Sequence, residues 1–211
     1  MVATGITRYT PHALVSTVVF EFMHIADELA GNWAPFEPFN EPLVATVGMG
    51  AFTLVALAGI GLAVGGSGNS VSGVTVAATL LGGILSIGSS GTFNHVLERE
   101  VDQKMKRTSG RPLVDGVVPV RNAVAFGLVL GVASLGVFVV YVNVLAAVLD
   151  FIAILFYTFV YTVVLKPNTT QNIVIGGAVG ALPALIGWSA VEGSVGVPAL
   201  VLGGVIFLWT P

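Results

Sequence analysis

Three side chains that could bind a metal ion recur at intervals of four residues in one polar segment: Asn94, Glu98 and Asp102. On a helix, steps of four place side chains on one face, so an amide oxygen and two carboxylates would point the same way. Such oxygen ligands suit Mg²⁺, which keeps several waters and shares its remaining positions between carboxylates and substrate phosphates. The spacing makes these three residues candidate metal ligands.

Basic side chains follow at once, at Lys104, Lys106, Arg107 and Arg111. Cations beside a carboxylate-bound metal suit a diphosphate, because arginine grips phosphate with paired donors and lysine acts as a point charge. A prenyl diphosphate joins such a head group to a hydrocarbon tail. A mixed-charge loop between two membrane spans is the simpler explanation, and the spacing leaves both open. His95 is open in the same way between a hydrogen-bonded and a catalytic histidine.

The composition indicates where this segment lies. The chain has 211 residues, 55% of them hydrophobic, and 9% charged residues against about 25% in a typical soluble domain. So little charge cannot cover a soluble surface, and the apolar surplus predicts lipid contact. There is no cysteine, which excludes disulfides and thiolate metal sites. The net charge of −3 gives no reason to expect nucleic acid as a partner.

Apolar stretches divide the chain into membrane spans. A spanning helix needs about 20 mostly apolar residues, and six stretches approach this length. The sequence therefore predicts an all-α, polytopic transmembrane helical bundle. Residues 1–40 are interrupted by charge and are interpreted as an N-terminal extension, interfacial or loosely ordered. The six predicted spans are residues 42–64, 71–93, 117–142, 143–165, 172–191 and 196–211.

The distribution of basic residues predicts the orientation. Six of the eight lie in or beside the loop after the second span, and Lys166 lies in the loop after the fourth. If the spans alternate in direction, these two loops share one side of the membrane. Lysine and arginine accumulate on the cytoplasmic side. We therefore expect a multi-pass protein of the cell membrane whose charged loop, residues 94–116, faces the cytoplasm.

Small residues and one carboxyl group stand out within the spans. Gly127 and Gly131 are four apart, and Gly176 lies in a glycine cluster; small side chains let helices approach closely in lipid. Packing is the expected role of these glycines. Asp150 lies inside the fourth predicted span, where an ionised carboxylate is costly unless it faces a polar environment. The sequence leaves its role open between structure and function.

The charged segment also resembles a known family. Residues 94–113 resemble the first polar motif, N-x-x-x-D-x-x-x-D, of the UbiA-type intramembrane prenyltransferases, with glutamate at Glu98 in place of aspartate. The run E-R-E-V-D-Q-K-M-K-R-T-S-G-R-P-L is similar to the branch that farnesylates heme. Segments 157–166, 172–188 and 207–211 continue the likeness, which covers residues 42–211.

The resemblance implies a fold, a reaction and a set of site residues. It implies about nine spanning helices, of which six would be present here. The implied reaction is Mg²⁺-dependent transfer of a farnesyl group from farnesyl diphosphate to a vinyl group of heme b, giving heme o. Asn94, Glu98 and Asp102 would be the catalytic, metal-binding residues. Arg107 and Arg111 would contact the diphosphate, with Lys104 a weaker candidate.

Completeness and substrate also follow from the resemblance. The family's second acidic motif would come after Pro211, so residues 41–211 are expected to form the N-terminal two-thirds of the domain, in a shortened member or a fragment. Two other hypotheses stand beside heme farnesylation. One is a prenyltransferase of the same fold that acts on a quinone precursor or a lipid, and the other is a truncated, non-catalytic membrane protein.

Overall fold

The structure, a computed structural model, describes residues 40–106, 108, 109, 111 and 113–209, with side chains from residue 50 onward. The interpreted N-terminal extension, the predicted diphosphate ligand Arg107 and residues 210–211 therefore lie outside the described residues. Contacts divide the chain into Met1–Gly50 and Ala51–Pro211. In the first unit, the described residues Asn40 to Gly50 begin a helix. The second unit carries the candidate site.

Every regular element within the described ranges is helical, which confirms the predicted all-α class. Ser72 and Asn143 begin two of the helices, and each side chain accepts a hydrogen bond from the backbone three residues later, at Thr75 and Ala146. Gly193 ends another helix with a φ of +62°, a conformation that favours glycine. The elements are α2 (Asn40–Ser67), α3 (Gly73–Asp102), α4 (Val120–Tyr141), α5 (Val144–Leu155), the π-helix η2 (Phe156–Leu165), α6 (Lys166–Asn168), α7 (Asn172–Glu192) and α8 (Val197–Trp209).

Five of the six predicted spans are long and apolar enough to cross a membrane. The fourth of them joins α5, η2 and α6 into one helical segment, Val144–Asn168. Residues Val197–Trp209 form a shorter apolar helix of 13 residues, below the length of about 20 that spans a bilayer. The sixth span therefore remains a prediction.

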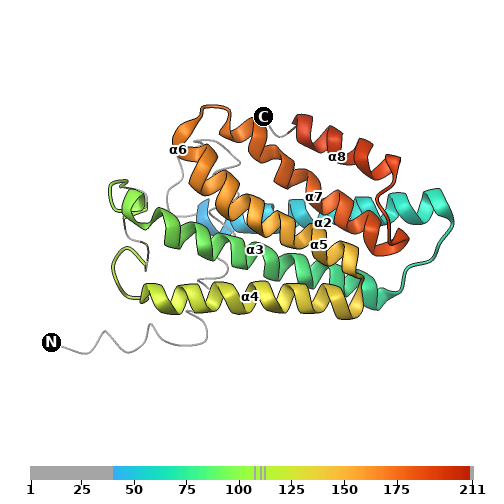
Figure 1. Cartoon of the computed structure of the whole chain (residues 1–211), viewed down its shortest axis with the longest axis horizontal. Coiled ribbons are helices and arrows are strands. Elements are labelled where there is room, and N and C mark those ends of the chain that lie inside the picture. Colours follow the sequence, from blue (N-terminus) through green and yellow to red (C-terminus); the bar gives the residue numbers. More distant parts are fainter. Residues whose placement is uncertain (1–39, 107, 110, 112, 210–211) are drawn as a thin grey trace. The chain divides into compact units, whose positions relative to one another are not determined.

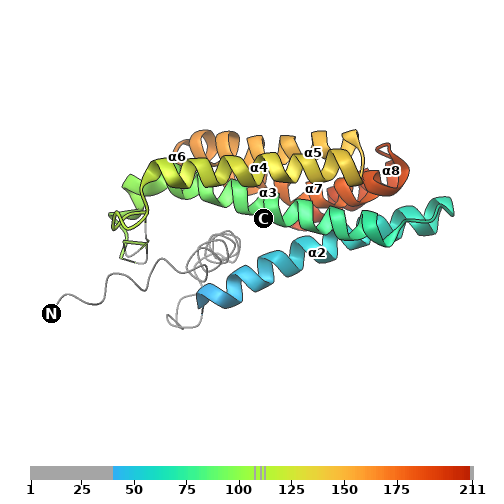
Figure 2. The ribbon, with the colours of Figure 1, turned by 90° about the horizontal axis from the view of Figure 1, so that it is seen from below.

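The long helices pack as neighbours through glycines and small polar groups. Helices α3 and α4 run side by side, with α5 next to them (Figures 1 and 2). The hydroxyl of Ser89 on α3 donates a hydrogen bond of 2.8 Å to the carbonyl of Gly127 on α4. A Cβ at Gly127 would lie 3.3 Å from the ring of Phe93, and one at Gly131 would lie 2.9 Å from Ser89 Oγ. The expected packing role of these two glycines is confirmed.

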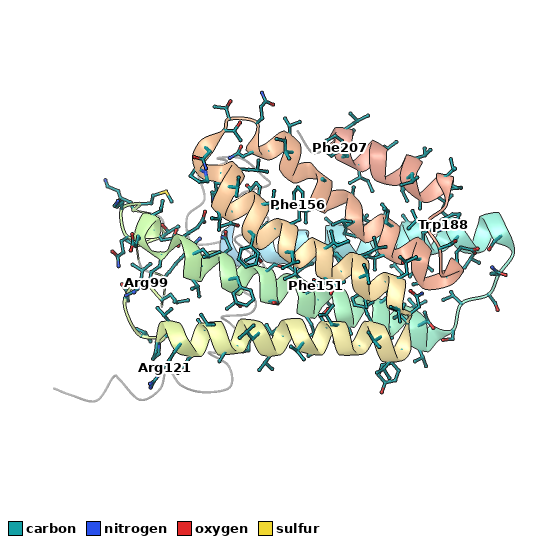
Figure 3. The ribbon with its side chains drawn as sticks, viewed as in Figure 1. Arg99, Arg121, Phe151, Phe156, Trp188 and Phe207 are labelled. Carbon is teal, nitrogen blue, oxygen red and sulfur yellow. The ribbon has the colours of Figure 1, made fainter. Side chains whose placement is uncertain are left out.

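The connections gather at two ends of the bundle. The loop after α3 and the short helix α6 lie at one end, and Arg99 and Arg121 are found there, whereas Trp188 lies toward the other (Figures 1 and 3). At the second end, Asn69 donates a 3.1 Å hydrogen bond to Glu192, and the Asn143 amide donates one of 2.6 Å to the carbonyl of Ser189. The two basic loops therefore share one end of the molecule, as alternating spans require.

Candidate functional site

Helix α3 positions the predicted metal ligands by its length. It has 30 residues, and a rise of about 1.5 Å per residue makes it about 45 Å long, against a hydrocarbon core of about 30 Å. A helix of this length that spans the core must extend past it. Its last turns carry Asn94, Glu98 and Asp102, so these side chains lie at one end of the bundle.

Asn94 is the innermost of the three and is buried. Its amide nitrogen donates a hydrogen bond of 3.2 Å to Glu98 Oε2, one helical turn later. Its amide oxygen lies 2.9 Å from the hydroxyl oxygen of Thr162 on η2, and that hydroxyl shares its hydrogen with the carbonyl of Tyr157, 3.0 Å away in the preceding turn. The structure thus brings together the first two predicted ligands and connects them to a helix 68 residues further along the chain.

Glu98 forms an ion pair with a residue that the sequence did not place in the site. Lys166 Nζ lies 2.8 Å from Glu98 Oε1 and 2.9 Å from Oε2. The side chains are 28% and 12% exposed, so water screens this pair only partly. Lys166 lies at the start of α6, directly after the π-helix, and its ammonium reaches the acidic face of α3.

Asp102 forms the second ion pair, with the predicted diphosphate ligand Arg111. Arg111 Nη1 lies 2.6 Å from Asp102 Oδ2, and both side chains are almost fully buried. Asp102 Oδ1 is buried as well and has no hydrogen-bond partner among the described residues. A carboxylate oxygen in this position is costly to leave unpaired. It is therefore the best-placed oxygen on α3 for a bound cation or a donor group.

The loop after α3 folds back to deliver Arg111. Backbone turns run from Gln103 onward, and the hydroxyl of Thr108 donates a 2.9 Å hydrogen bond to the carbonyl of Asp102. Arg99 Nε donates to the carbonyl of Leu113 at 3.0 Å, and the Leu113 side chain is buried. Lys104, the weaker predicted diphosphate ligand, is exposed on this loop.

The donor set fits Mg²⁺ in its chemistry, because every candidate atom is an amide or carboxylate oxygen. Its geometry differs from the simplest expectation. Glu98 and Asp102 each face a cation, and the described residues contain no group of three acidic or histidine side chains that could hold a metal. A metal held here would take at most two carboxylates from this part of the chain, with other oxygens completing its shell.

The π-helix is the local feature that sequence reasoning missed. Residues Phe156–Leu165 were expected to continue an ordinary helix, but they form ten residues of π-helix. Such segments are rare and are frequent at functional sites. Tyr157 and Tyr161 stack with ring centroids 5.4 Å apart, and a Cβ at Gly176 of α7 would lie 2.7 Å from the ring of Tyr161. This packing holds the helix face that carries Thr162 toward α3.

Two site residues could have been found from the sequence. Lys166 lies after an even number of predicted spans, as the acidic motif does, so topology alone places it at the same end. Thr162 is a hydroxyl residue one helical turn before it. His95, which the sequence left open between a hydrogen-bonded and a catalytic histidine, is buried.

Sequence comparisons identify a matching family model and several similar proteins. A sequence model described as the UbiA prenyltransferase family matches residues 52–211. A protoheme IX farnesyltransferase of Halobacterium salinarum is 65% identical over 160 residues, which are 75% of this chain and 36% of that protein. One of Haloarcula marismortui is 55% identical over 187 residues, 84% of this chain and 40% of that protein.

A bacterial relative matches as well. Protoheme IX farnesyltransferase 1 of Saccharopolyspora erythraea is 57% identical over 136 residues, 64% of this chain and 44% of that protein. The chain therefore spans between a third and a half of the length of these relatives. No solved structure matches it.

Proposed function

The chain belongs to the UbiA prenyltransferase family, and from this premise we propose that its site serves the transfer of a farnesyl group from farnesyl diphosphate to a vinyl group of heme b. The product would be heme o, and diphosphate would be released. The names of the relatives support this choice of substrates. The observation that carries the proposal is the pair of acid–base contacts, Glu98 with Lys166 and Asp102 with Arg111, at one end of an apolar bundle.

These residues suit the departure of a diphosphate. The bond between the first farnesyl carbon and oxygen breaks, and the diphosphate leaves with the electron pair, so negative charge grows on its oxygen. Arg111 and Lys166 would place donors where that charge develops, and fixed donors stabilise a transition state without reorganising. Arg107 is proposed as a further contact of the same kind.

Asn94, Glu98 and Asp102 are proposed to hold Mg²⁺. When bound, this ion would neutralise the leaving diphosphate as a Lewis acid. The unpartnered oxygen of Asp102 and the all-oxygen donor set support the proposal. Thr162 would fix the orientation of the Asn94 amide by donating to its oxygen.

The carbon chemistry needs an environment poor in water. The farnesyl cation is attacked by the terminal vinyl carbon of heme b, and a carbon–carbon bond forms. Water then adds to the cation left on the vinyl group and loses a proton, which gives the hydroxyl of heme o. Five long apolar spans support a site that excludes earlier capture by water.

The proposed location follows from the charges. The basic residues at one end of the bundle support a cell-membrane protein whose charged segment 94–116, the end of α3 and the loop after it, faces the cytoplasm. Farnesyl diphosphate, heme b and the lipid bilayer are the proposed partners. The assignment of residues 41–211 to the N-terminal two-thirds of a prenyltransferase domain stays a prediction.

A chimera tests the function directly. Residues 52–211 would replace the matching segment of the Halobacterium salinarum relative, in a host that makes no heme o of its own. We expect heme o in the extracted pigments, identified by chromatography and mass. A prenylated quinol or lipid in its place would support the other prenyltransferase hypothesis. Absence of any prenylated product, with the relative itself active, would support a non-catalytic chain.

A further inference from the structure

A buried polar cluster lies apart from the candidate site, where α3, α4 and α5 meet. Asp150 of α5 is 1% exposed. Its Oδ2 lies 2.7 Å from the hydroxyl oxygen of Ser134 on α4, and its side chain also forms a hydrogen bond with Ser86 of α3. Ser134 Oγ lies 2.8 Å from the carbonyl oxygen of Gly82 on α3 as well. None of these residues belongs to the diphosphate site.

Counting hydrogens constrains the protonation state of this cluster. A serine hydroxyl carries one hydrogen and can donate only one full hydrogen bond. The Gly82 carbonyl can only accept, and two oxygens 2.8 Å apart need a hydrogen between them, so the hydroxyl hydrogen of Ser134 points to Gly82. If Asp150 were ionised it could only accept too, and Ser134 would face two acceptors with one hydrogen. A proton on Asp150 removes the conflict, because the acid then donates to Ser134, which donates to Gly82.

The surroundings favour the same assignment. Asp150 lies within a candidate membrane span, Val144–Asn168, and an ionised carboxylate in an apolar interior is costly without a cation beside it. Its described hydrogen-bond partners are two neutral hydroxyls. With Asp150 protonated, each polar group of the cluster has a hydrogen-bond partner. Ser86 donates to the carboxyl group, the carboxyl group donates to Ser134, and Ser134 donates to the carbonyl of Gly82.

We propose that Asp150 is a neutral carboxylic acid that fixes the helix Val144–Asn168 against α3 and α4, and so acts as a positioning residue for the candidate site. That helix is continuous from Asp150 to Thr162 and Lys166, which contact Asn94 and Glu98. It is therefore attached to α3 at two levels, by Asp150 in one half and by Thr162 in the other. Loss of the attachment at Asp150 would let Thr162 and Lys166 shift relative to α3.

Infrared spectroscopy of the purified chain tests the protonation state. The spectrum should contain the carbonyl band of a protonated carboxylic acid, and this band should be missing from the Asp150→Asn variant. A carboxylate band that disappears in the variant would overturn the proposal. This measurement does not depend on the reaction, so it separates failure of this inference from failure of the proposed function.

Substitutions test the positioning role, in the chain for stability and in the chimera for activity. Asparagine offers the same donor and acceptor as the neutral acid. Asp150→Asn should therefore leave the unfolding temperature unchanged and keep heme o output within about twofold of that of the unsubstituted protein. Asp150→Ala removes both. A lost interhelical hydrogen bond in lipid shifts the helix-packing equilibrium roughly three- to tenfold, and heme o output should fall by a similar factor. A loss in Asp150→Asn as large as in Asp150→Ala would overturn the proposal, because the negative charge would then be required.

Discussion

At the scale of single residues, the site is organised by two ion pairs. The sequence predicted the acidic partners, Glu98 and Asp102, from their spacing, and the structure gives each a cation within 3 Å. It could not predict which cation each would face, because ion pairing depends on how the loop and the fourth span fold back. Arg111 was expected to contact the substrate, and Lys166 was not expected in the site.

Asp102 is the residue on which the proposed metal site depends most. Replacing Asp102 with asparagine in the chimera keeps the size of the side chain but removes the negative charge that would bind Mg²⁺ and pair with Arg111. We expect heme o output to fall on the order of a hundredfold, as is typical when one electrostatic contact to a transition state is lost. Chromatography of extracted hemes measures it.

Glu100 provides the matched control for that variant. It lies on the same helix, is exposed, and stands away from the face that carries Asp102. Glu100→Gln makes the same acid-to-amide change and should leave heme o output within about twofold, as for most exposed substitutions. Equal losses in the two variants would contradict a specific role for Asp102.

Lys166 is expected to act on the binding of the diphosphate. Replacing it with methionine retains the apolar stem and removes the donor, and it leaves Glu98 without its cation. We expect a loss of roughly ten- to a hundredfold in kcat/KM for farnesyl diphosphate, the range of a charge-assisted hydrogen bond. Lys106→Met, an exposed lysine of the loop after α3, is the control. An unchanged kcat/KM in the Lys166 variant would remove this residue from the proposed site.

At the scale of elements, the sequence predicted the helices well and their contacts poorly. Hydrophobic length gave the five confirmed spans, and the third and fourth predicted spans adjoin at Asn143, which caps α5. The π-helix at Phe156–Leu165 was missed, because its sequence follows no period that differs visibly from an ordinary helix. Which glycines touch a neighbouring helix also depends on side-chain positions that spacing alone does not fix.

The glycines of α2 offer a sharp test of these contacts. A Cβ at Gly59 would collide with the backbone carbonyl of Ala184 on α7, whereas one at Gly61, two residues later, would meet nothing within 4 Å. Backbone cannot move aside as a flexible side chain can, so Gly59→Ala should lower the unfolding temperature by several degrees, consistent with overpacking costs of about 1–3 kcal/mol.

Gly61→Ala is the control on the same helix. It should leave the unfolding temperature unchanged or raise it slightly, because alanine is a better helix former than glycine. Thermal unfolding of both variants in the same detergent measures the difference. If Gly61→Ala destabilised the protein as much as Gly59→Ala, the close approach of α2 and α7 at Gly59 would be wrong.

At the scale of the whole molecule, charge and topology support each other. The two basic loops were expected on one side because spans alternate, and they lie at the same end of the bundle (Figure 1). The sequence could predict this because direction reverses with every span. It could not predict the ion pair between Glu98 and Lys166, 68 residues apart, since that depends on the rotation of each helix about its axis.

The orientation of the molecule in the membrane can be tested with single cysteines, because the chain contains none. Ser109, on the basic loop, and Ser194, in the connection between α7 and α8, are both exposed, and their connections lie at opposite ends of the bundle (Figure 1). A membrane-impermeant maleimide added to intact cells should label Ser194→Cys at once. It should label Ser109→Cys only after the cells are opened, because basic loops are retained in the cytoplasm. The reverse pattern would place the proposed diphosphate site outside the cytoplasm, away from a water-soluble pool of prenyl diphosphate. The proposed reaction would then lack its farnesyl donor, and the proposal would be contradicted.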